Sequence, residues 1–389
     1  MSKKTSRKHF LNTSLSFGII LTLPQFLETC QSLPTRDEGM PIFADAQVPN
    51  IWKALYAGSL SPNPHNTQAW KFKVISERSV LLFVDESRIL PFTDPSQRQI
   101  HIGQGCFIEC FKMGASSLGF ETKVTYFPEG EYKMTQTGKK PVAKLSLEPT
   151  KEKPNPLFQS LQTRTTNRSV YSDKNVKGED LLQISGQINS EQGNLIWIPG
   201  SNSKFSEIQG LLIEAFALEI NLTRTNEESR IWFRTTDSEI YEKKDGISLR
   251  GNGMTGLSYF FISNFFVSTK PEDWHSDFTK NAAIDSFRKQ VNSAKAFGYI
   301  KTPKNSPRDW VNAGESYARV NLLLNEKRYA IHPMSQILQE YPEMDALRLK
   351  LEKLLEIPSS EKIQMLFRIG RSDYHFQSPR RDISNLEIK

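Results

Sequence analysis

The chain has 389 residues, which is enough for two domain-sized units with a large buried core and excludes a peptide or a single small module. Lys and Arg number 50 against 43 Asp and Glu, a net charge of +7, but residues 1–30 hold +3 of it. The remaining +4 is ordinary and gives no sign of a nucleic-acid-binding stripe. A hydrophobic share of 38%, with no apolar run of about 18 residues, excludes a polytopic membrane protein.

The N-terminus has the layout of an export signal. Four basic residues precede an apolar stretch at 17–27, which is too short for a conventional membrane span. Residues 6–12 resemble the twin-arginine export motif, with Lys8 in place of the second arginine. Cys30 closes the stretch, and either it carries a lipid or it is incidental to a cleaved signal. We therefore expect an export signal at 1–30, a periplasmic or envelope location, and membrane attachment at the N-terminus if Cys30 is lipidated.

Residues 31–150 alternate β-rich runs with one long helical pattern. The helix is expected to begin at Asp94-Pro95, since this pair is typical of a helix start. The expected order is strands at 70–75 and 80–85, a helix from Asp94 to Gly119, and strands at 122–127 and 142–147. A proline-rich segment at 149–156 is the best linker in the chain.

Residues 151–389 hold more helix. The expected order is a helix ending at Thr163, a helix at 178–188, a strand at 195–198, a long helix at 205–233, a strand at 296–301, helices at 307–329, 334–341 and 344–355, and a strand at 363–369. The aromatic-rich stretch at 225–300 has no counterpart in the first half. It is interpreted as a lid or interface over a ligand, a helical subdomain with its own core, or a membrane-contacting face around 260–267.

The two halves share a theme. In each, a strand leads through Asp94-Pro95 or Ser306-Pro307 into a long helix with a glycine about two turns in, at Gly103 or Gly314. This pattern favours an α+β protein of two related halves, 31–150 and 151–389, each a small mixed sheet flanked by helices.

Several classes of site lack support. The histidines show no metal-ligand spacing, and neither a cysteine-pair motif nor a nucleophile elbow is present. Cys106 and Cys110 lie four apart in a helical pattern, where a mutual disulfide is disfavoured, so they are interpreted as core residues. Residues 251–256 match the dinucleotide glycine pattern but lack a preceding buried strand, which leaves a flexible turn as the alternative to a phosphate loop.

Three polar motifs remain. Residues 62–70, with Asn63, Asn66 and Gln68, offer donors and acceptors before a strand, suited either to the edge of a flat heterocycle or to capping a turn. Arg164, Thr166 and Arg168 suit a terminal phosphate or form a solvated arginine pair. Arg380 and Arg381 follow the last strand and could be a second phosphate clamp or a basic tail.

Together these motifs resemble the nitroreductase superfamily of FMN enzymes, in particular its Acg-like branch. Asn66, Gln68 and Trp70 match the loop that meets the flavin in that family, while Asn63 and Ala69 replace its serine and proline. Residues 164–168 resemble its phosphate motif, with Thr166 for serine, and the C-terminal arginines resemble its closing basic pair. Ordinary members are homodimers that share the site between subunits, so this order of motifs implies two halves fused in one chain.

The resemblance implies one noncovalent FMN per chain, held by Asn63, Asn66, Gln68, Arg164, Thr166, Arg168, Arg380 and Arg381. Among the arginines, Arg164, Arg168 and Arg381 are expected to contact the phosphate first, with Arg380 next. The implied activity is NAD(P)H-dependent reduction of nitroaromatics, quinones or similar acceptors by a monomer or weak homodimer. The cofactor supplies the chemistry, so no catalytic side chain is named. The alternatives are a flavin-sequestering envelope protein with little turnover and, without the family match, a scaffold lipoprotein.

Overall fold

The structure, a computed structural model, describes residues 40–263 and 267–389. The expected export signal and Cys30 lie outside the described residues. No helix within the described ranges is long and apolar enough to cross a membrane.

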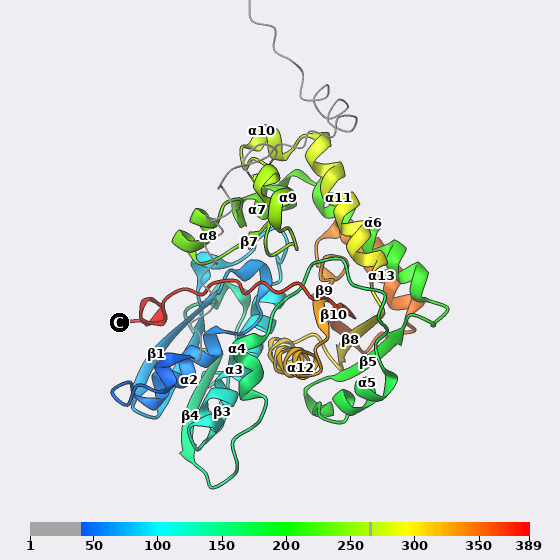
Figure 1. Cartoon of the computed structure of the whole chain (residues 1–389). Helices are drawn as coiled ribbons and strands as arrows, with labels where there is room; N and C mark the ends of the chain where they lie inside the picture. Colours follow the sequence, from blue (N-terminus) through cyan, green and yellow to red (C-terminus); the bar gives the residue numbers. More distant parts are fainter. Residues whose placement is uncertain (1–39, 264–266) are drawn as a thin grey trace, which may run out of the picture. The chain divides into compact units, whose positions relative to one another are not determined.

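The first half is built around a four-stranded sheet in the order β1-β2-β4-β3 (Figure 1). Its elements are α2 (Asn50–Ser59), β1 (Trp70–Ser76), β2 (Ser79–Val84), α3 (Arg98–Ser117), β3 (Phe120–Tyr126) and β4 (Ala143–Pro149). Burial alternates along β2, with Val80, Leu82 and Val84 buried, as expected for a strand with one face on a core. The buried face packs with α2 and α3.

The second half contains a four-stranded sheet in the order β5-β8-β10-β9. Its elements are α4 (Phe158–Thr163), α5 (Gly178–Ser185), β5 (Asn194–Pro199), β8 (Ala296–Thr302), α12 (Pro307–Glu326), β9 (Ala330–Pro333), α13 (Asp345–Leu354) and β10 (Lys362–Gly370). β10 lies between β8 and β9 and is buried at eight of its nine residues. This strand is therefore the centre of the second core.

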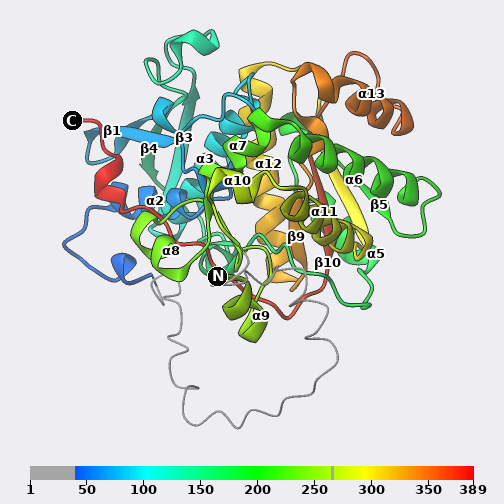
Figure 2. The same cartoon turned by 90° about the horizontal axis from the view of Figure 1, so that it is seen from above.

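The two sheets repeat one topology. Each half runs through two strands, a helix of 20 residues and two more strands, and each sheet has the spatial order first-second-fourth-third. This confirms the expected α+β class with two related halves. The strands of both sheets are antiparallel, where mixed sheets were expected. The C-terminal tail adds one parallel bridge, from Glu387 to Phe72 at the edge of β1. In Figures 1 and 2 the C-terminus accordingly lies beside β1.

Helices α3 and α12 pack together through glycines. Gly105 and Gly314 are each the eighth residue of their helix. A Cβ on Gly105 would lie 1.9 Å from the carbonyl oxygen of Val311, and one on Gly314 would lie 2.0 Å from that of Ile102. Only glycine permits this approach of two backbones. The equivalent of Gly314 is therefore Gly105. The sequence pattern had indicated Gly103 instead.

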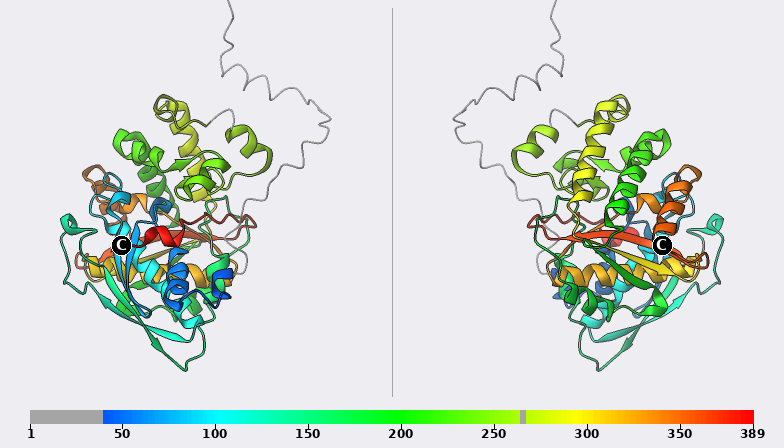
Figure 3. Two further views of the ribbon diagram at one scale, coloured as in Figure 1. Left: turned by 90° about the vertical axis from the view of Figure 1, so that its left-hand side faces the viewer. Right: turned by 90° about the vertical axis from the view of Figure 1, so that its right-hand side faces the viewer.

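A large insertion joins β5 to β8, where the first half has a tight turn between β1 and β2. It contains α6 (Phe205–Asn221), α7 (Thr223–Ile231), β6 (Phe233–Arg234), α8 (Asp237–Lys243), β7 (Ile247–Ser248), α9 (Gly256–Phe261), α10 (Pro271–Trp274) and α11 (Asp277–Asn292). Figure 3 shows its green and yellow helices gathered on one side of the sheets. The insertion is thus longer than the expected 225–300 and largely helical.

Two of the expected helices are wrong, and helix α2 was not expected. The long helix expected at 205–233 is two helices, because Leu222 is extended (φ −80°, ψ 116°). The helix expected at 334–341 is only a short 3-10 turn at Gln336–Leu338. Strand β9, just before it, was not expected. The amide of Met334 donates to the carbonyl of Leu366 (2.7 Å), which keeps this backbone on the sheet and away from a helical path.

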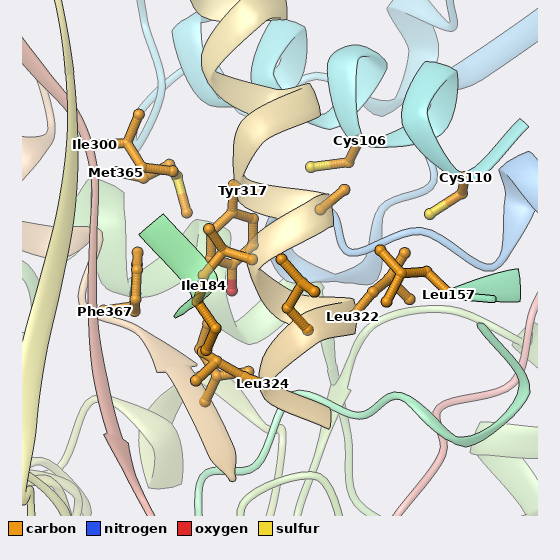
Figure 4. Packing of buried hydrophobic residues seen from close by; sticks show 14 of the residues in the cluster. Cys106, Cys110, Leu157, Ile184, Ile300, Tyr317, Leu322, Leu324, Met365 and Phe367 are labelled. Atoms are coloured by element: carbon orange, nitrogen blue, oxygen red, sulfur yellow. The ribbon is translucent and has the colours of Figure 1, made fainter. Parts of the chain in front are cut away.

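The cores confirm the reading of the two cysteines. Cys106 and Cys110 are buried on α3, in a cluster that includes Tyr317 and Leu322 of α12 and Phe367 of β10 (Figure 4). The Cys106 thiol donates to the carbonyl of Gly314 at 3.2 Å. One apolar cluster therefore joins helices from both halves.

Candidate functional site

The loop before β1 has an unusual backbone. His65, Asn66 and Gln68 all have positive φ, between 48° and 51°. The side-chain oxygen of Asn63 accepts from the amide of Gln68 at 2.8 Å, which closes the turn. Non-glycine residues seldom adopt this region, and strained polar residues concentrate at functional sites.

Arg380 fastens this loop to the C-terminal tail. Its guanidinium donates to the carbonyls of Ser59 (2.8 Å) and Ser61 (3.0 Å) and to the side-chain oxygen of Asn66 (2.9 Å). Burial, reinforced by Arg164, lowers the pKa of Arg380 to about 9. Arg380 therefore holds the loop in place, and it also lines a hollow.

Gln68 and Arg381 lie together, away from that hollow. The Gln68 amide donates to the carbonyl of Lys244 (2.7 Å) and accepts from the backbone amide of Arg381 (2.8 Å). The Arg381 guanidinium lies 3.5 Å from a carboxylate oxygen of Asp85. Neither residue lines either hollow. The expected order of the two C-terminal arginines is thus reversed: Arg380 faces the site, and Arg381 faces Asp85.

The first hollow brings the two halves together. Its volume is about 450 Å³, and its wall is made by Pro62, Asn63, Asn66, Arg164, Thr165, Thr166, Arg168, Gly246, Ile247, Ser248, Gly251, Phe376, Ser378 and Arg380. Six of the eight residues expected from the sequence are in this set. Its polar groups are guanidiniums, hydroxyls and amides, and none of the lining residues described is an Asp or Glu.

Besides Arg380, two guanidiniums give this hollow its charge. Arg164 is 2% exposed and donates to the side-chain oxygen of Asn321 at 3.3 Å. Arg168 is half-buried, and none of the described residues forms a hydrogen bond or ion pair with its guanidinium. Burial lowers the pKa of both arginines. Buried positive charge is costly without a counter-charge, so this wall favours an anion.

A second hollow of about 770 Å³ adjoins the first, and the two share Pro62, Asn63, Thr166, Arg168 and Ile247. The rest of its wall is Pro64, His65, Gln99, Ile102, Gly103, Cys106, Tyr317, His332, Pro333, Ser335, Gln336, Gln339 and Met365. The first hollow is cationic, and the second is lined by both apolar and polar side chains.

Two histidines of the second hollow stay uncharged at neutral pH. Burial, together with Arg168, lowers the pKa of His65 to about 4. Burial, with Arg368 and Arg168 nearby, holds the pKa of His332 well below its ordinary value. His65 lies within the 62–70 motif but was not among the expected ligands, and His332 was considered only for metal-ligand spacing. The proximity of His65 to the Asn63–Gln68 loop was a usable signal, whereas His332 offered none.

Among the described residues of the insertion, one short stretch lines this space. Gly246 to Ser248 and Gly251 line the first hollow. The glycine pattern at 251–256 follows the two-residue strand β7 and precedes the six-residue helix α9, so it is not part of a dinucleotide-binding unit. Trp232 instead packs under Arg88, 4.9 Å from the guanidinium carbon to the ring centre.

Comparison with known proteins gives a partial likeness. No family model matches the chain. A segment of 78 residues is 31% identical to "Putative NAD(P)H nitroreductase acg" of Mycobacterium tuberculosis, in both strain H37Rv and strain CDC 1551. The match covers 20% of this chain and 23% of those proteins, so it spans about a quarter of the length of the curated relatives.

Solved structures show distant likeness. The FMN and NADPH-dependent nitroreductase NfnB from Sphigopyxis sp. strain HMH has a TM-score of 0.36 and 16% identity, covering 59% of this chain and 97% of that one. NfnB from Mycobacterium smegmatis in complex with NADPH has a TM-score of 0.34 and 14% identity, covering 57% and 92%. A nitroreductase with bound FMN from Desulfitobacterium hafniense DCB-2 has a TM-score of 0.35 and 10% identity, covering 59% and 96%. Scores and identities this low carry no argument about the site.

Proposed function

We propose that this protein is an FMN-binding oxidoreductase that uses NAD(P)H to reduce nitroaromatics, quinones or similar small acceptors. The observation that carries the proposal is the first hollow. There Arg164 and Arg168, beside Thr166, face the Asn63–Asn66 loop of the other half with no carboxylate in the wall. Bidentate cations with a neighbouring hydroxyl suit a terminal phosphate.

The residues present fit FMN. Arg168 has donors that no described residue uses, which is the condition expected of a phosphate ligand. The second hollow has apolar side chains against which a flat ring system would pack, among them Ile102, Tyr317 and Met365, and polar side chains that would hydrogen-bond to it. A compound with a phosphate and a ring therefore matches the charge of the first hollow and the mixed lining of the second.

The flavin would supply hydride and electron transfer, so the chain's own residues need only bind, orient and shield. Arg164, Arg168 and Thr166 would hold the phosphate. Asn63 and Asn66 would face the ring, and Arg380 keeps their loop in place through its hydrogen bonds to Ser59, Ser61 and Asn66. Gln68 and Arg381, which do not line the hollow, stabilise the same loop through the hydrogen bond between them.

The decisive experiment is reconstitution. The full chain is incubated with FMN, separated from free FMN, and its visible spectrum is recorded before and after anaerobic addition of NADH or NADPH. A bound flavin spectrum that bleaches with the nicotinamide and recovers with a quinone supports the proposal. A protein that retains no flavin overturns it.

A second candidate function is flavin sequestration with little turnover. It is favoured by two segments that border the first hollow, the insertion at Gly246–Gly251 and the C-terminal tail at Phe376 and Ser378. In this case the flavin is retained, but nicotinamides reduce it slowly. The same spectra separate the two functions through the rate of bleaching.

The setting proposed for this activity rests on the sequence. Basic residues and an apolar stretch in the first thirty residues support export to the periplasm or envelope, with lipid attachment at Cys30 as the alternative to cleavage. A pairing of both halves within one chain supports a monomer. Fractionation of cells and the mass of the mature protein test these points.

A further inference from the structure

The segment His332–Gln339 of the second hollow carries polar atoms that the proposed phosphate and loop contacts do not use. It follows strand β9 and contributes five residues to the wall: His332, Pro333, Ser335, Gln336 and Gln339. His332 is 5% exposed and Gln339 is 4% exposed. Polar side chains buried to this extent normally have hydrogen-bond partners.

His332 is held in one tautomer. The Nε of Arg368 donates to its Nδ1 at 3.1 Å, and because a guanidinium only donates, Nδ1 carries the lone pair. The ring is neutral, as shown above, so its one proton lies on Nε2. Among residues 40–263 and 267–389, none accepts a hydrogen bond from this N–H. His332 therefore brings an unused donor to the hollow.

Arg368 is itself fixed. Its guanidinium donates to the carbonyls of Gln290 (2.6 Å) and Ser169 (2.8 Å) and lies 3.9 Å above the ring of Tyr171. It is fully buried. The imidazole therefore keeps its orientation whether or not a ligand is present, as a histidine does when a neighbouring group holds its other nitrogen.

Gln339 supplies the complementary acceptor. Its Nε2 donates to a carboxylate oxygen of Glu219 at 2.6 Å, which leaves Oε1 as the end without a protein donor. In the part of the chain that the structure describes, Oε1 of Gln339 and Oε1 of Gln336 are buried and accept no hydrogen bond. A donor and acceptors thus stand on one segment of the wall.

We propose that His332–Gln339 is a subsite for a carbonyl group adjacent to an N–H, as in a primary carboxamide or a cyclic imide. The Nε2–H of His332 donates to the ligand carbonyl, and Oε1 of Gln339 accepts from the ligand N–H. The inference rests on the proposed function, since a nicotinamide carries such a carboxamide and a flavin carries such an imide edge. A neutral donor beside a neutral acceptor matches these groups. A second phosphate or a carboxylate would place its negative charge against amide oxygens, which only accept hydrogen bonds.

The test uses two substitutions at His332 that distinguish the roles of its two ring nitrogens. His332→Asn keeps an acceptor for Arg368 but is too short to replace Nε2, whereas His332→Gln reaches further and keeps an N–H donor. His275→Asn is the matched control, because His275 is also hydrogen-bonded but does not line the hollow. FMN affinity is measured by titration of the full chain. Affinity for a tetrahydro analogue of NADH, which gives no hydride, is measured on the FMN-loaded protein.

We expect His332→Asn to weaken one of the two affinities about tenfold, the effect of one lost hydrogen bond to a buried group. His332→Gln and His275→Asn should stay near wild type, and His332→Asn should unfold at the wild-type temperature. A loss confined to FMN identifies the imide, and a loss confined to the analogue identifies the carboxamide. Gln339→Met should reduce the same affinity.

Unchanged affinities in His332→Asn, in a protein that binds FMN, would overturn the subsite and leave water as the partner of these atoms. A wild-type chain that binds no FMN would overturn the proposed function instead. Nitrogen NMR of the ring gives a readout independent of ligand. A protonated Nδ1 in His332 would also overturn the subsite.

Discussion

Gly105 of α3 and Gly314 of α12 occupy the same position in two helices of equal length, and each faces the backbone of the other helix. The contact is reciprocal, since Gly105 meets Val311 and Gly314 meets Ile102, each the fifth residue of its helix. This pairing is the local two-fold relation between the halves, and the second hollow borders on it through Ile102 and Cys106.

Gly105→Ala and Gly314→Ala should each destabilise the protein. A new methyl group would overlap a carbonyl oxygen of the facing helix, and overpacking typically costs about 1–3 kcal/mol. Gly210→Ala is the matched control, because nothing lies within 4 Å of that helical position, and it should be neutral or stabilising by up to about 1 kcal/mol. Urea unfolding measures all three. Equal stability of the three variants would contradict the close approach.

Arg168→Ala should weaken FMN binding about ten- to a hundredfold, because a charge-assisted bond to a buried phosphate contributes about 1.5–3 kcal/mol. Riboflavin, which lacks the phosphate, should bind the wild-type protein and Arg168→Ala with the same affinity. Arg381→Ala is the control outside the hollow. If Arg168→Ala lost FMN and riboflavin equally, the phosphate assignment would be wrong.

One FMN should bind per chain. The position equivalent to Cys106 is Glu315, a buried carboxylate that accepts from Lys112 (2.5 Å), Tyr126 (2.5 Å) and Gln192 (2.7 Å). This cluster occupies the place where a second, symmetry-related hollow would need an apolar floor. Flavin absorbance combined with mass in solution measures the ratio. Two flavins per chain would disprove this argument.

Stability should fall as the pH rises from about 4.5 to about 7. Burial raises the pKa of Glu219 to about 7, with Glu228 adding to the effect and Gln339 opposing it. The folded state therefore holds this proton more tightly than the unfolded chain. Its contribution is complete below the unfolded pKa and is lost as the pH passes the folded one, with a slope of at most about 1.4 kcal/mol per pH unit.

Glu219→Gln should flatten this dependence, and Glu214→Gln, an exposed position on the same helix, should leave it intact. Unfolding free energies at several pH values provide the comparison. An identical slope in wild type and Glu219→Gln would assign the effect to other groups, such as Asp94, whose pKa is raised by burial to about 6.

The insertion should slow reduction of the flavin if it acts as a lid. Arg250 holds the segment beside the hollow through two contacts of 2.7 Å to Asp237. Arg250→Ala should speed bleaching by NADH and weaken FMN retention, whereas Arg224→Ala, which breaks an exposed pair with Glu343, should do neither. Stopped-flow reduction measures the rate. Fast reduction in the wild type would favour an ordinary reductase.

The long helices α3 and α12 could be predicted from the sequence, whereas the short strand β9 could not. Periodicity and capping placed α3 and α12 to within a few residues, because their buried faces repeat over many turns. Strand β9 has four residues, and its neighbours Met334, Ile337 and Leu338 have helical spacing. Only the hydrogen bond from Met334 to Leu366 decides that this segment follows the sheet. That partner is distant in sequence, so local pattern could not reveal it.

The candidate site could likewise be predicted only in part from the sequence. Local motifs identified Asn63, Asn66, Arg164, Thr166 and Arg168, which the structure gathers at one hollow. They could not tell Arg380 from Arg381, since neighbours in an extended chain point to opposite sides and only the packing of the tail decides which side is inward. The tautomer of His332 is set by Arg368 in the adjacent strand. The positions of the histidines in the sequence do not reveal this contact.

The C-terminal tail crosses from the second half to the first, where the amide of Ile388 donates to the carbonyl of Phe72 at 2.7 Å. In a protein of two separate subunits, such a crossing must be recovered after every dissociation, at a rate set by protein concentration. Here the tail, its docking strand and the hollow that the tail lines belong to one covalent chain, so their mutual concentration is effectively millimolar at any dilution. A protein built in this way keeps its candidate site assembled when it meets no second copy of itself.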